Sequence, residues 1–355
     1  MIELREILER LLQRRDLREA EAGELLVALT DPSVAPAMSG AMLAALRSKG
    51  ITPDEVRGFA GAMRSLARKP QLPPGSPAID IVGTGGDASG SFNLSSAAAL
   101  LVAAMGLRVI KHGNRSVSSR SGSADLLEAL GVPMPLDEQA AGDCLAATGF
   151  TFLFAPHYHP AMKEVAPVRR ALGVRTVFNL LGPLTNPAEP PFGIIGAYST
   201  DAAKLMADTL AGMPIQRVFV IHGEPGWDEA TPVGPFELHD VQPGRVTREV
   251  RDPLDLGLRR CSPTDLAGGD AEHNALGLRA VFEGRDTGPH RDAIVLNAAL
   301  ALEVTGAVPD AAAGVAAARD AIRRGDGARL LERLAAFGRG SGTRARGQGT
   351  GDRGQ

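Results

Sequence analysis

The stretch from Asp80 to Gly131 constrains the fold most, because it places two polar, glycine-containing loops directly after predicted strands. The first strand runs into the loop GTGGD at 83–87, where three glycines permit positive φ angles and close approach of a ligand to the backbone. The apolar run Ala97 to Met105 predicts a helix, with Ser95 and Ser96 as its expected caps. The free N–H groups at the start of such a helix favour an anion.

A second unit of the same kind follows along the chain. Leu107 to Ile110 predicts a strand that opens into a loop at 111–123 with three cations and five serines, and Ala124 to Leu130 predicts the next helix. Two such units in tandem place both loops at the carboxyl edge of one parallel sheet, which suits a ligand with two phosphate-bearing ends. Neither loop matches the dinucleotide-binding or P-loop signature, and a glycine loop taken alone is equally consistent with a tight turn.

The rest of the chain predicts an α/β fold: a small helical domain plus a large α/β domain with a mostly parallel central sheet and helices on its faces. Residues 1–72 are expected to form the helical domain, 73–337 the α/β domain and 338–355 a disordered, glycine- and arginine-rich tail. Further strands are expected at Phe150–Phe154, Phe192–Tyr198 and Arg217–His222, an antiparallel hairpin at Phe236–Val241 and Val246–Val250, and a helical segment at Pro160–Leu184.

An acidic pair, Asp228 and Glu229, follows the strand expected at Arg217–His222. Mg²⁺ prefers oxygen ligands and commonly takes one or two carboxylates, with substrate phosphates completing its shell. Such a pair in a loop is often only a solvated surface feature, but its position beyond a strand end, facing two anion-binding loops, favours a metal site. The histidines lack zinc-site spacing, and no nucleophile elbow is present, which favours chemistry by positioning and electrostatics over a covalent intermediate.

Composition excludes several classes of protein. A formal charge of −3 and a pI near 6.2 argue against a dedicated nucleic-acid binder. Two cysteines, Cys144 and Cys261, offer neither a disulfide framework nor a cysteine metal site. The charged N-terminus is unlike a signal peptide and no apolar run reaches membrane-spanning length, so we expect a cytoplasmic protein without membrane contact.

The ordered motifs GTGGD, SFNLSSAAA, KHGNRSVSS, SGSADLLEALG, YHPAMKEVAPVRRALGVRTVFNLLGPLTNP and the later Asp228-Glu229 resemble those of the anthranilate phosphoribosyltransferase family over nearly the whole chain except the tail. The resemblance implies a pentosyltransferase that converts anthranilate and phosphoribosyl pyrophosphate into N-phosphoribosyl-anthranilate and pyrophosphate, the second step of tryptophan synthesis. It also implies that residues near 160–190 join the helical domain, and that two copies associate through the helical domains as a homodimer.

The resemblance carries site residues over by motif. Phosphoribosyl pyrophosphate is expected to contact Gly83, Gly86, Asp87, Ser91, Asn93, Leu94, Ser95, Ser96, Lys111, His112, Gly113, Asn114, Arg115, Ser116, Val117, Ser118, Ser119 and Ser123. Anthranilate is expected to contact Gly83, His112, Asn114, Arg169 and Pro183. Mg²⁺ is the expected cofactor, held by Ser95, Asp228 and Glu229, and the catalytic residues are expected to be Lys111, Asn114 and Arg169. The sequence departs from the family pattern at Ser91, where the family has threonine, and at Pro232 and Pro235.

The chemistry agrees with these roles. Displacing pyrophosphate from ribose C1 passes through an oxocarbenium-like centre, so catalysis requires neutralising the leaving group while the amine is held in line. The aniline nitrogen is already nucleophilic at neutral pH, and the planar guanidinium of Arg169 matches the carboxylate of anthranilate. Two alternatives remain at this point: a pyrimidine nucleoside phosphorylase, and a non-catalytic relative that binds nucleic acid. The KHGN stretch and the acidic pair disfavour the first, and the acidic balance disfavours the second.

Overall fold

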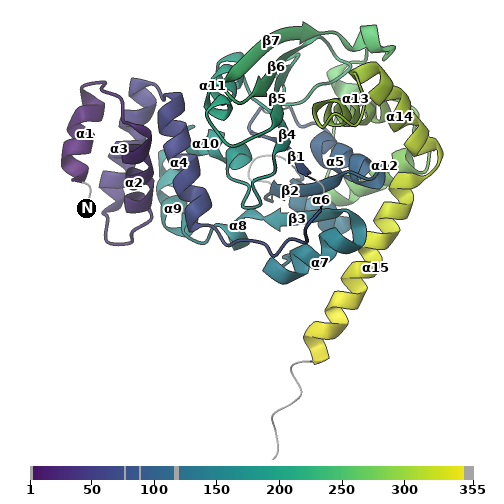
Figure 1. The fold of residues 1–355 in the computed structure, drawn as a ribbon, viewed down its shortest axis with the longest axis horizontal. Helices are drawn as coiled ribbons and strands as arrows, with labels where there is room; N and C mark the ends of the chain where they lie inside the picture. Colours follow the sequence, from purple (N-terminus) through teal and green to yellow (C-terminus); the bar gives the residue numbers. More distant parts are fainter. Residues whose placement is uncertain (1–2, 76, 88, 116–119, 348–355) are drawn as a thin grey trace, which may run out of the picture.

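Four helices lie together at one end of the molecule, apart from the sheet (Figure 1). The computed structural model describes residues 3–75, 77–87, 89–115 and 120–347, with side chains up to residue 339. The four helices are α1 (Leu4–Leu12), α2 (Glu19–Leu29), α3 (Pro36–Lys49) and α4 (Pro53–Leu66). α4 begins with a capping box, because the Glu55 N–H donates to Thr52 Oγ1 (3.3 Å) while the Glu55 carboxylate accepts from the Thr52 N–H (2.9 Å).

A seven-stranded sheet in the order β3-β2-β1-β4-β5-β6-β7 forms the centre of the rest of the chain. Its strands are β1 (Ala78–Gly83), β2 (Arg108–Gly113), β3 (Phe150–Phe154), β4 (Phe192–Gly196), β5 (Arg217–Gly223), β6 (Phe236–Gln242) and β7 (Arg245–Arg251). β1 to β5 pair in parallel, and β6 and β7 form an antiparallel hairpin at one edge. The predicted mostly parallel sheet and the hairpin are therefore confirmed. The strand order reverses at β1, between β2 and β4, and ligands of open α/β sheets bind at the carboxyl end of such a point.

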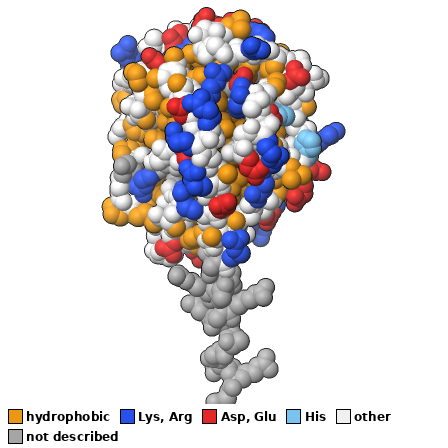
Figure 2. All heavy atoms as spheres, turned by 90° about the vertical axis from the view of Figure 1, so that its right-hand side faces the viewer, with side chains coloured by type: hydrophobic (Ala, Val, Ile, Leu, Met, Phe, Trp, Pro, Cys, Tyr) orange, Lys and Arg blue, Asp and Glu red, His pale blue; other side chains and the backbone are white. Residues whose placement is uncertain are grey.

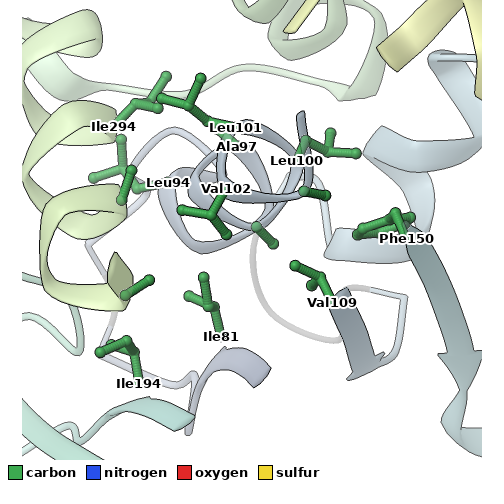
Figure 3. Packing of buried hydrophobic residues seen from close by; sticks show 14 of the residues in the cluster. Ile81, Leu94, Ala97, Leu100, Leu101, Val102, Val109, Phe150, Ile194 and Ile294 are labelled. Atoms are coloured by element: carbon green, nitrogen blue, oxygen red, sulfur yellow. The ribbon is translucent and has the colours of Figure 1, made fainter. Parts of the chain in front are cut away.

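Helices cover both faces of this sheet. The remaining elements are α5 (Leu94–Ala104), α6 (Ser123–Ala129), α7 (Glu138–Thr148), α8 (Ala155–Tyr158), α9 (Met162–Leu172), α10 (Phe178–Leu181), η1 (Gly182–Leu184), α11 (Thr200–Ala211), η2 (Pro253–Leu256), η3 (Pro263–Leu266), α12 (Ala271–Phe282), α13 (Pro289–Val304), α14 (Ala311–Arg323) and α15 (Asp326–Gly347). α5 is apolar around its circumference and is buried between the sheet and α13, where Leu94, Leu101 and Val102 pack against Ile81 and Ile294 (Figure 3). This burial holds the N-terminus of α5 at the carboxyl end of β1.

A second hydrophobic cluster joins the four N-terminal helices to the sheet. It contains Leu25 and Phe59 from these helices, Phe178 from α10, and Val218 and Val220 from β5. Ring contacts continue this packing, since Phe59 and Phe178 meet edge to face at 6.1 Å. The helical region thus packs on the sheet through α9, α10 and α11.

Two element boundaries near the loops differ from the sequence-based expectation. α5 begins at Leu94 with Asn93 as its N-cap, so Ser95 and Ser96 lie inside the first turn. β2 continues through Lys111, His112 and Gly113, because β3 pairs with all three residues and holds them extended. These three residues therefore belong to a strand and not to the loop in which they were expected.

Two helical segments also differ. The helix expected at Pro160–Leu184 is interrupted, since Gly173 adopts a left-handed conformation (φ 62°) that ends α9, and α10 and η1 follow separately. α15 continues beyond Phe337 to Gly347 and projects from the body (Figure 1), so residues 338–347, which were expected to be disordered, are helical. Four of the ten residues from 338 to 347 are glycines, which disfavour a helix, so local propensity does not account for this extension. Residues 348–355 lie outside the described part.

Candidate active site

The glycine loop after β1 is built around the side chain of Asp228. A Cβ at Gly83 would lie 2.2 Å from Asp228 Oδ2, and a Cβ at Gly196 would lie 1.5 Å from the Asp228 carbonyl oxygen. Gly83 and Gly196 are paired residues at the ends of β1 and β4, so two glycines at the reversal point of the sheet create the space that Asp228 occupies. Gly85 and Gly86 then turn with positive φ (67° and 74°), and the Gly85 N–H donates to Asp228 Oδ2 at 2.6 Å.

Glu229 ties the same loop region to the start of α5. Its carboxylate accepts the backbone N–H of Ser95 at 3.0 Å and the hydroxyl of Ser91 at 3.1 Å. Serine and threonine both carry the hydroxyl that donates to Glu229, so the departure from threonine at position 91 keeps this hydrogen bond. Asp228 and Glu229 are both buried (9% and 8% exposed), and no arginine or lysine forms an ion pair with either among the described residues.

Burial is the main cause that raises the pKa of both carboxyls, and negative neighbours add to it: Asp87 raises the pKa of Asp228, and Asp228 raises the pKa of Glu229. Two such carboxyls, one of them bonded to the backbone N–H of Ser95, supply the oxygen donors that Mg²⁺ prefers. The sequence-predicted ligands Ser95, Asp228 and Glu229 are thus brought together. Within the described residues no group of three or more His, Cys, Asp or Glu side chains is placed to hold a metal ion by itself.

Lys111 lies beneath these groups and is almost fully buried (1% exposed). Its ammonium donates to the Ile81 carbonyl and lies 3.5 Å from Ser95 Oγ. Burial lowers its pKa, while the charges of Asp80, Glu229 and Asp228 oppose that shift. The lysine predicted as a loop cation is instead buried at the sheet end, next to the carboxyl pair.

Two residues that the sequence analysis missed organise this buried layer. Asp80 accepts the Asn186 side-chain amide at 2.8 Å, and the same amide nitrogen donates to the Ile110 carbonyl at 2.8 Å. Burial raises the pKa of Asp80 to about 6, with Lys111 opposing the shift. Asn186 thereby links β1 to β2 below the two loops. Its position just after LLGPLT was visible in the sequence, but its contact with a residue more than 100 positions away was not.

The second loop is only partly described, because Ser116, Val117, Ser118 and Ser119 lie outside the described residues. Gly113 ends β2 in close contact with Ser123, whose hydroxyl donates to the Asn114 carbonyl at 3.2 Å. The Arg115 guanidinium, predicted to bind phosphate, is paired with Glu128 at 2.7 Å and Asp125 at 3.0 Å. In this structure Arg115 therefore forms its ion pairs with two carboxylates of α6.

The start of α5 joins the two loops. Asn93 donates its amide to the Ser121 carbonyl (3.1 Å) and accepts from the amide of Asn274 (2.8 Å), a residue that the sequence analysis missed. The side chains of Leu94 and Ser96 are buried (0% and 1% exposed), so these two predicted ligands can offer an anion their backbone N–H groups only.

A histidine-rich wall lies beside the buried layer. His112 Nδ1 is 3.2 Å from the carbonyl of Gly182, which precedes Pro183, and its ring meets His159 edge to face at 5.0 Å. Burial lowers the pKa of His112 to about 3 and the pKa of His159 to about 4, so both rings are neutral at neutral pH. The predicted neighbours His112 and Pro183 are thus close together.

Two arginines of the interrupted helical segment, Arg169 and Arg175, make different contacts near the site. The Arg169 guanidinium lies over the Phe178 ring at 5.0 Å and makes no ion pair within the described ranges. Burial lowers its pKa, although an arginine keeps its charge at neutral pH. Arg175, which was not predicted as a site residue, donates to the Gly86 carbonyl and stacks on Tyr198 at 4.0 Å. Arg175 therefore connects the helical region to the glycine loop.

The chain matches two family models in succession. Residues 5–67 match a glycosyl transferase family helical bundle domain, and residues 75–328 match the glycosyl transferase family a/b domain. The fold and the anion-directed site therefore define a two-part glycosyl transferase. In the part of the chain that the structure describes, no helix is long and apolar enough to cross a membrane.

Relatives narrow this class further. An anthranilate phosphoribosyltransferase of Methylobacterium nodulans is 47% identical over 90% of this chain and 94% of its own length, and one of Synechocystis is 44% identical over 93% and 96%. The crystal structure of anthranilate phosphoribosyltransferase from Thermus thermophilus superposes with a TM-score of 0.87 at 43% identity, covering 94% of this chain and 99% of the other. The chain belongs to the anthranilate phosphoribosyltransferase family. A Saccharomyces cerevisiae relative, solved in complex with PRPP and Mg, has a TM-score of 0.86 at 27% identity over 95% and 98%.

Proposed function

We propose that this chain transfers the phosphoribosyl group of phosphoribosyl pyrophosphate to the amine of anthranilate, giving N-phosphoribosyl-anthranilate and pyrophosphate. Family membership supports this reaction, and one structural observation carries it: two buried carboxyls meet a glycine loop and a helix N-terminus at the reversal point of the sheet. That arrangement suits a magnesium-bound diphosphate, since the cation satisfies the carboxyls and the N–H groups satisfy the phosphates.

The diphosphate end has a defined set of contacts in this proposal. Ser95, Asp228 and Glu229 would hold Mg²⁺, which supplies charge neutralisation to the departing pyrophosphate. The loop at Gly83–Asp87 and the first turn of α5 present backbone N–H groups to the phosphates, and Lys111 adds a fixed positive charge from below. Because these groups are held by buried contacts, they require little rearrangement as charge develops on the leaving group.

The amine end would lie toward the histidine-rich wall. A planar, aromatic acid needs an apolar surface and one cation. In this proposal Pro183 and neutral His112 provide the surface, and Arg169, which has no ion pair among the described residues, provides the cation. Gly83 and Asn114 stand at the ends of β1 and β2, between the two ends of the site. In this arrangement the amine approaches ribose C1 from the side opposite the pyrophosphate, and Arg169 fixes its orientation.

We also propose that the protein is a homodimer and that it acts in the cytoplasm. The helical region, formed by α1 to α4 with α9 and α10, is the proposed contact between two copies of the chain, and its exposed apolar side chains Leu12 and Val27 suit such a contact. The proposed compartment is the cytoplasm, with small-molecule substrates and no nucleic-acid or membrane partner. Size-exclusion chromatography with light scattering would test the homodimer.

The reaction itself is tested by anthranilate fluorescence. Anthranilate is mixed with the protein and phosphoribosyl pyrophosphate, with and without Mg²⁺, and the emission is followed with time. We expect a loss of signal that requires both the second substrate and the metal. A folded protein that leaves the signal unchanged under all conditions would overturn the proposal.

A further inference from the structure

A cleft of about 600 Å³ opens between the turn after η2, the start of α13 and the middle of α14. Four arginines line it, namely Arg259, Arg260, Arg291 and Arg319, together with one acidic residue, Asp292. None of the lining residues belongs to the candidate active site. The size falls in the range of small-molecule sites, which is larger than a surface contact for a single ion requires.

The cleft is richer in positive charge than its own ion pairs can neutralise. Arg291 pairs with Asp292 at 2.7 Å, and Arg319 approaches the same carboxylate only to 3.7 Å. Arg260 pairs with Asp252 at 2.5 Å, while Arg259 is exposed and has no ion pair among the described residues. Four guanidinium groups therefore share two carboxylates.

The surrounding face is also basic. Figure 2 views the side of the molecule on which α14 lies, and arginine and lysine side chains gather in a band down this face. Further along α14 and α15 the arginines are paired within their own helices, as Arg323 is with Asp320 and Arg329 is with Asp326. The lining arginines differ because they come from three separate segments and point to one hollow.

One side-chain donor at the cleft has no acceptor among the described residues. This donor is the buried Nε of Arg319, whose terminal nitrogen lies 3.4 Å from the Gly257 carbonyl. The N-cap of the 16-residue helix α13 is Gly288, which has no side chain to cap the first turn, although its own N–H donates to Asp286 Oδ1 at 2.8 Å. A negatively charged group in the cleft would supply an acceptor to Arg319 and would interact favourably with the helix dipole.

We propose that this cleft is a second anion site, separate from the candidate active site, which binds a small phosphorylated anion with two linked phosphate groups. Planar guanidinium forks bind phosphate oxygens in pairs, so four of them match a diphosphate better than a single phosphate. When the anion is bound, it becomes the main partner of Arg319 in place of Asp292. It also neutralises the charge of Arg259.

The test is a titration with inorganic pyrophosphate, followed by isothermal calorimetry. The wild-type chain is compared with the cleft variant Arg259→Gln/Arg319→Gln and with the control Arg248→Gln/Arg323→Gln, which removes two exposed arginines outside the lining. We expect the cleft variant to bind one equivalent fewer than the wild type, or to bind that equivalent at least about tenfold more weakly, while the control is unchanged.

A cleft variant that binds pyrophosphate with the stoichiometry and affinity of the wild type would overturn the proposal, as would an equal loss in the control. Circular dichroism melting reports whether Arg319→Gln affects folding. If it does, Arg259→Gln alone carries the test with the same expectation, since this side chain is exposed. Anthranilate turnover by the cleft variant distinguishes failure of the proposed reaction from failure of the proposed anion site. Turnover depends on the active site and not on the cleft, so the cleft variant should keep it.

Discussion

The two ends of the candidate active site respond to burial in opposite ways. At the acidic end, Asp228 and Glu229 are removed from water, and burial raises the pKa of both carboxyls. At the histidine end, burial lowers the pKa of His112 to about 3 and that of His159 to about 4. The physical cause is the same, since a poorly solvated site disfavours whichever form carries charge.

This difference suits the two ends to the different ligands of the proposed reaction. Carboxyls held close together without a lysine or arginine ion pair among the described residues are stabilised by a divalent cation, so the acidic end suits a metal and its phosphates. Neutral imidazoles beside Pro183 present no charge, so the histidine end suits an uncharged aromatic ring with Arg169 to pair its carboxylate. A single buried layer thus separates two chemically distinct ends.

The largest effect is expected when the acidic end is removed. In Asp228→Asn/Glu229→Gln, kcat/KM should fall at least about a hundredfold, because the charges that hold the metal against the leaving pyrophosphate are gone. The exposed Glu224→Gln, in the same loop, is the matched control and should retain activity. Steady-state kinetics at varied Mg²⁺ would decide; a wild-type metal dependence in the double variant would remove the acidic pair from the mechanism.

A smaller effect is expected at the histidine end. Arg169→Ala should raise the KM for anthranilate by about tenfold or more and change the KM for phosphoribosyl pyrophosphate little, because one charge-assisted pair to the carboxylate is lost. Its neighbour Arg170 is exposed, and Arg170→Ala should behave as the wild type. Equal KM values for anthranilate in both variants would contradict the proposed role of Arg169.

The metal should bind more tightly as the pH rises. The raised pKa of Asp228 and of Glu229 means that protons must leave before the metal can bind, so the apparent affinity for Mg²⁺ should rise severalfold between pH 6 and pH 8. Calorimetry in buffers with different ionisation enthalpies measures the released protons. Binding that releases no proton at pH 6.5 would show that the carboxyls are already ionised.

The smallest effect at neutral pH is expected from His159. Its depressed pKa of about 4 means that the neutral ring stabilises the fold fully above pH 6.5, and that this stability is lost as the pH falls toward 4. Replacing it in His159→Gln should therefore flatten the acid dependence of the unfolding free energy by on the order of 2 kcal/mol. Denaturant unfolding from pH 7 to pH 4 checks this, with the exposed His273→Gln as control. An unchanged slope in His159→Gln would place the acid sensitivity elsewhere.

Local patterns predicted much of the architecture. The strand–loop–helix units, the antiparallel hairpin and the position of Asp228 and Glu229 beyond a strand end each depend on a short run of residues. Periodicity, caps and glycines report such features because the forces behind them act between near neighbours in the chain.

The positions of the charged groups at the sheet end depended on the tertiary structure. Lys111 and His112 are strand residues because β3 pairs with them, and Arg115 is directed to α6 because Glu128 and Asp125 lie within reach. Asp80, Asn186, Asn274 and Arg175 act through partners that are remote in sequence, and no local pattern marks them. The sequence by itself determined which residue types stand at the strand ends, whereas burial and long-range pairing decided which of them remain charged and what they contact. Desolvation and hydrogen bonding depend on the whole surroundings of a group, and only the folded chain provides those surroundings.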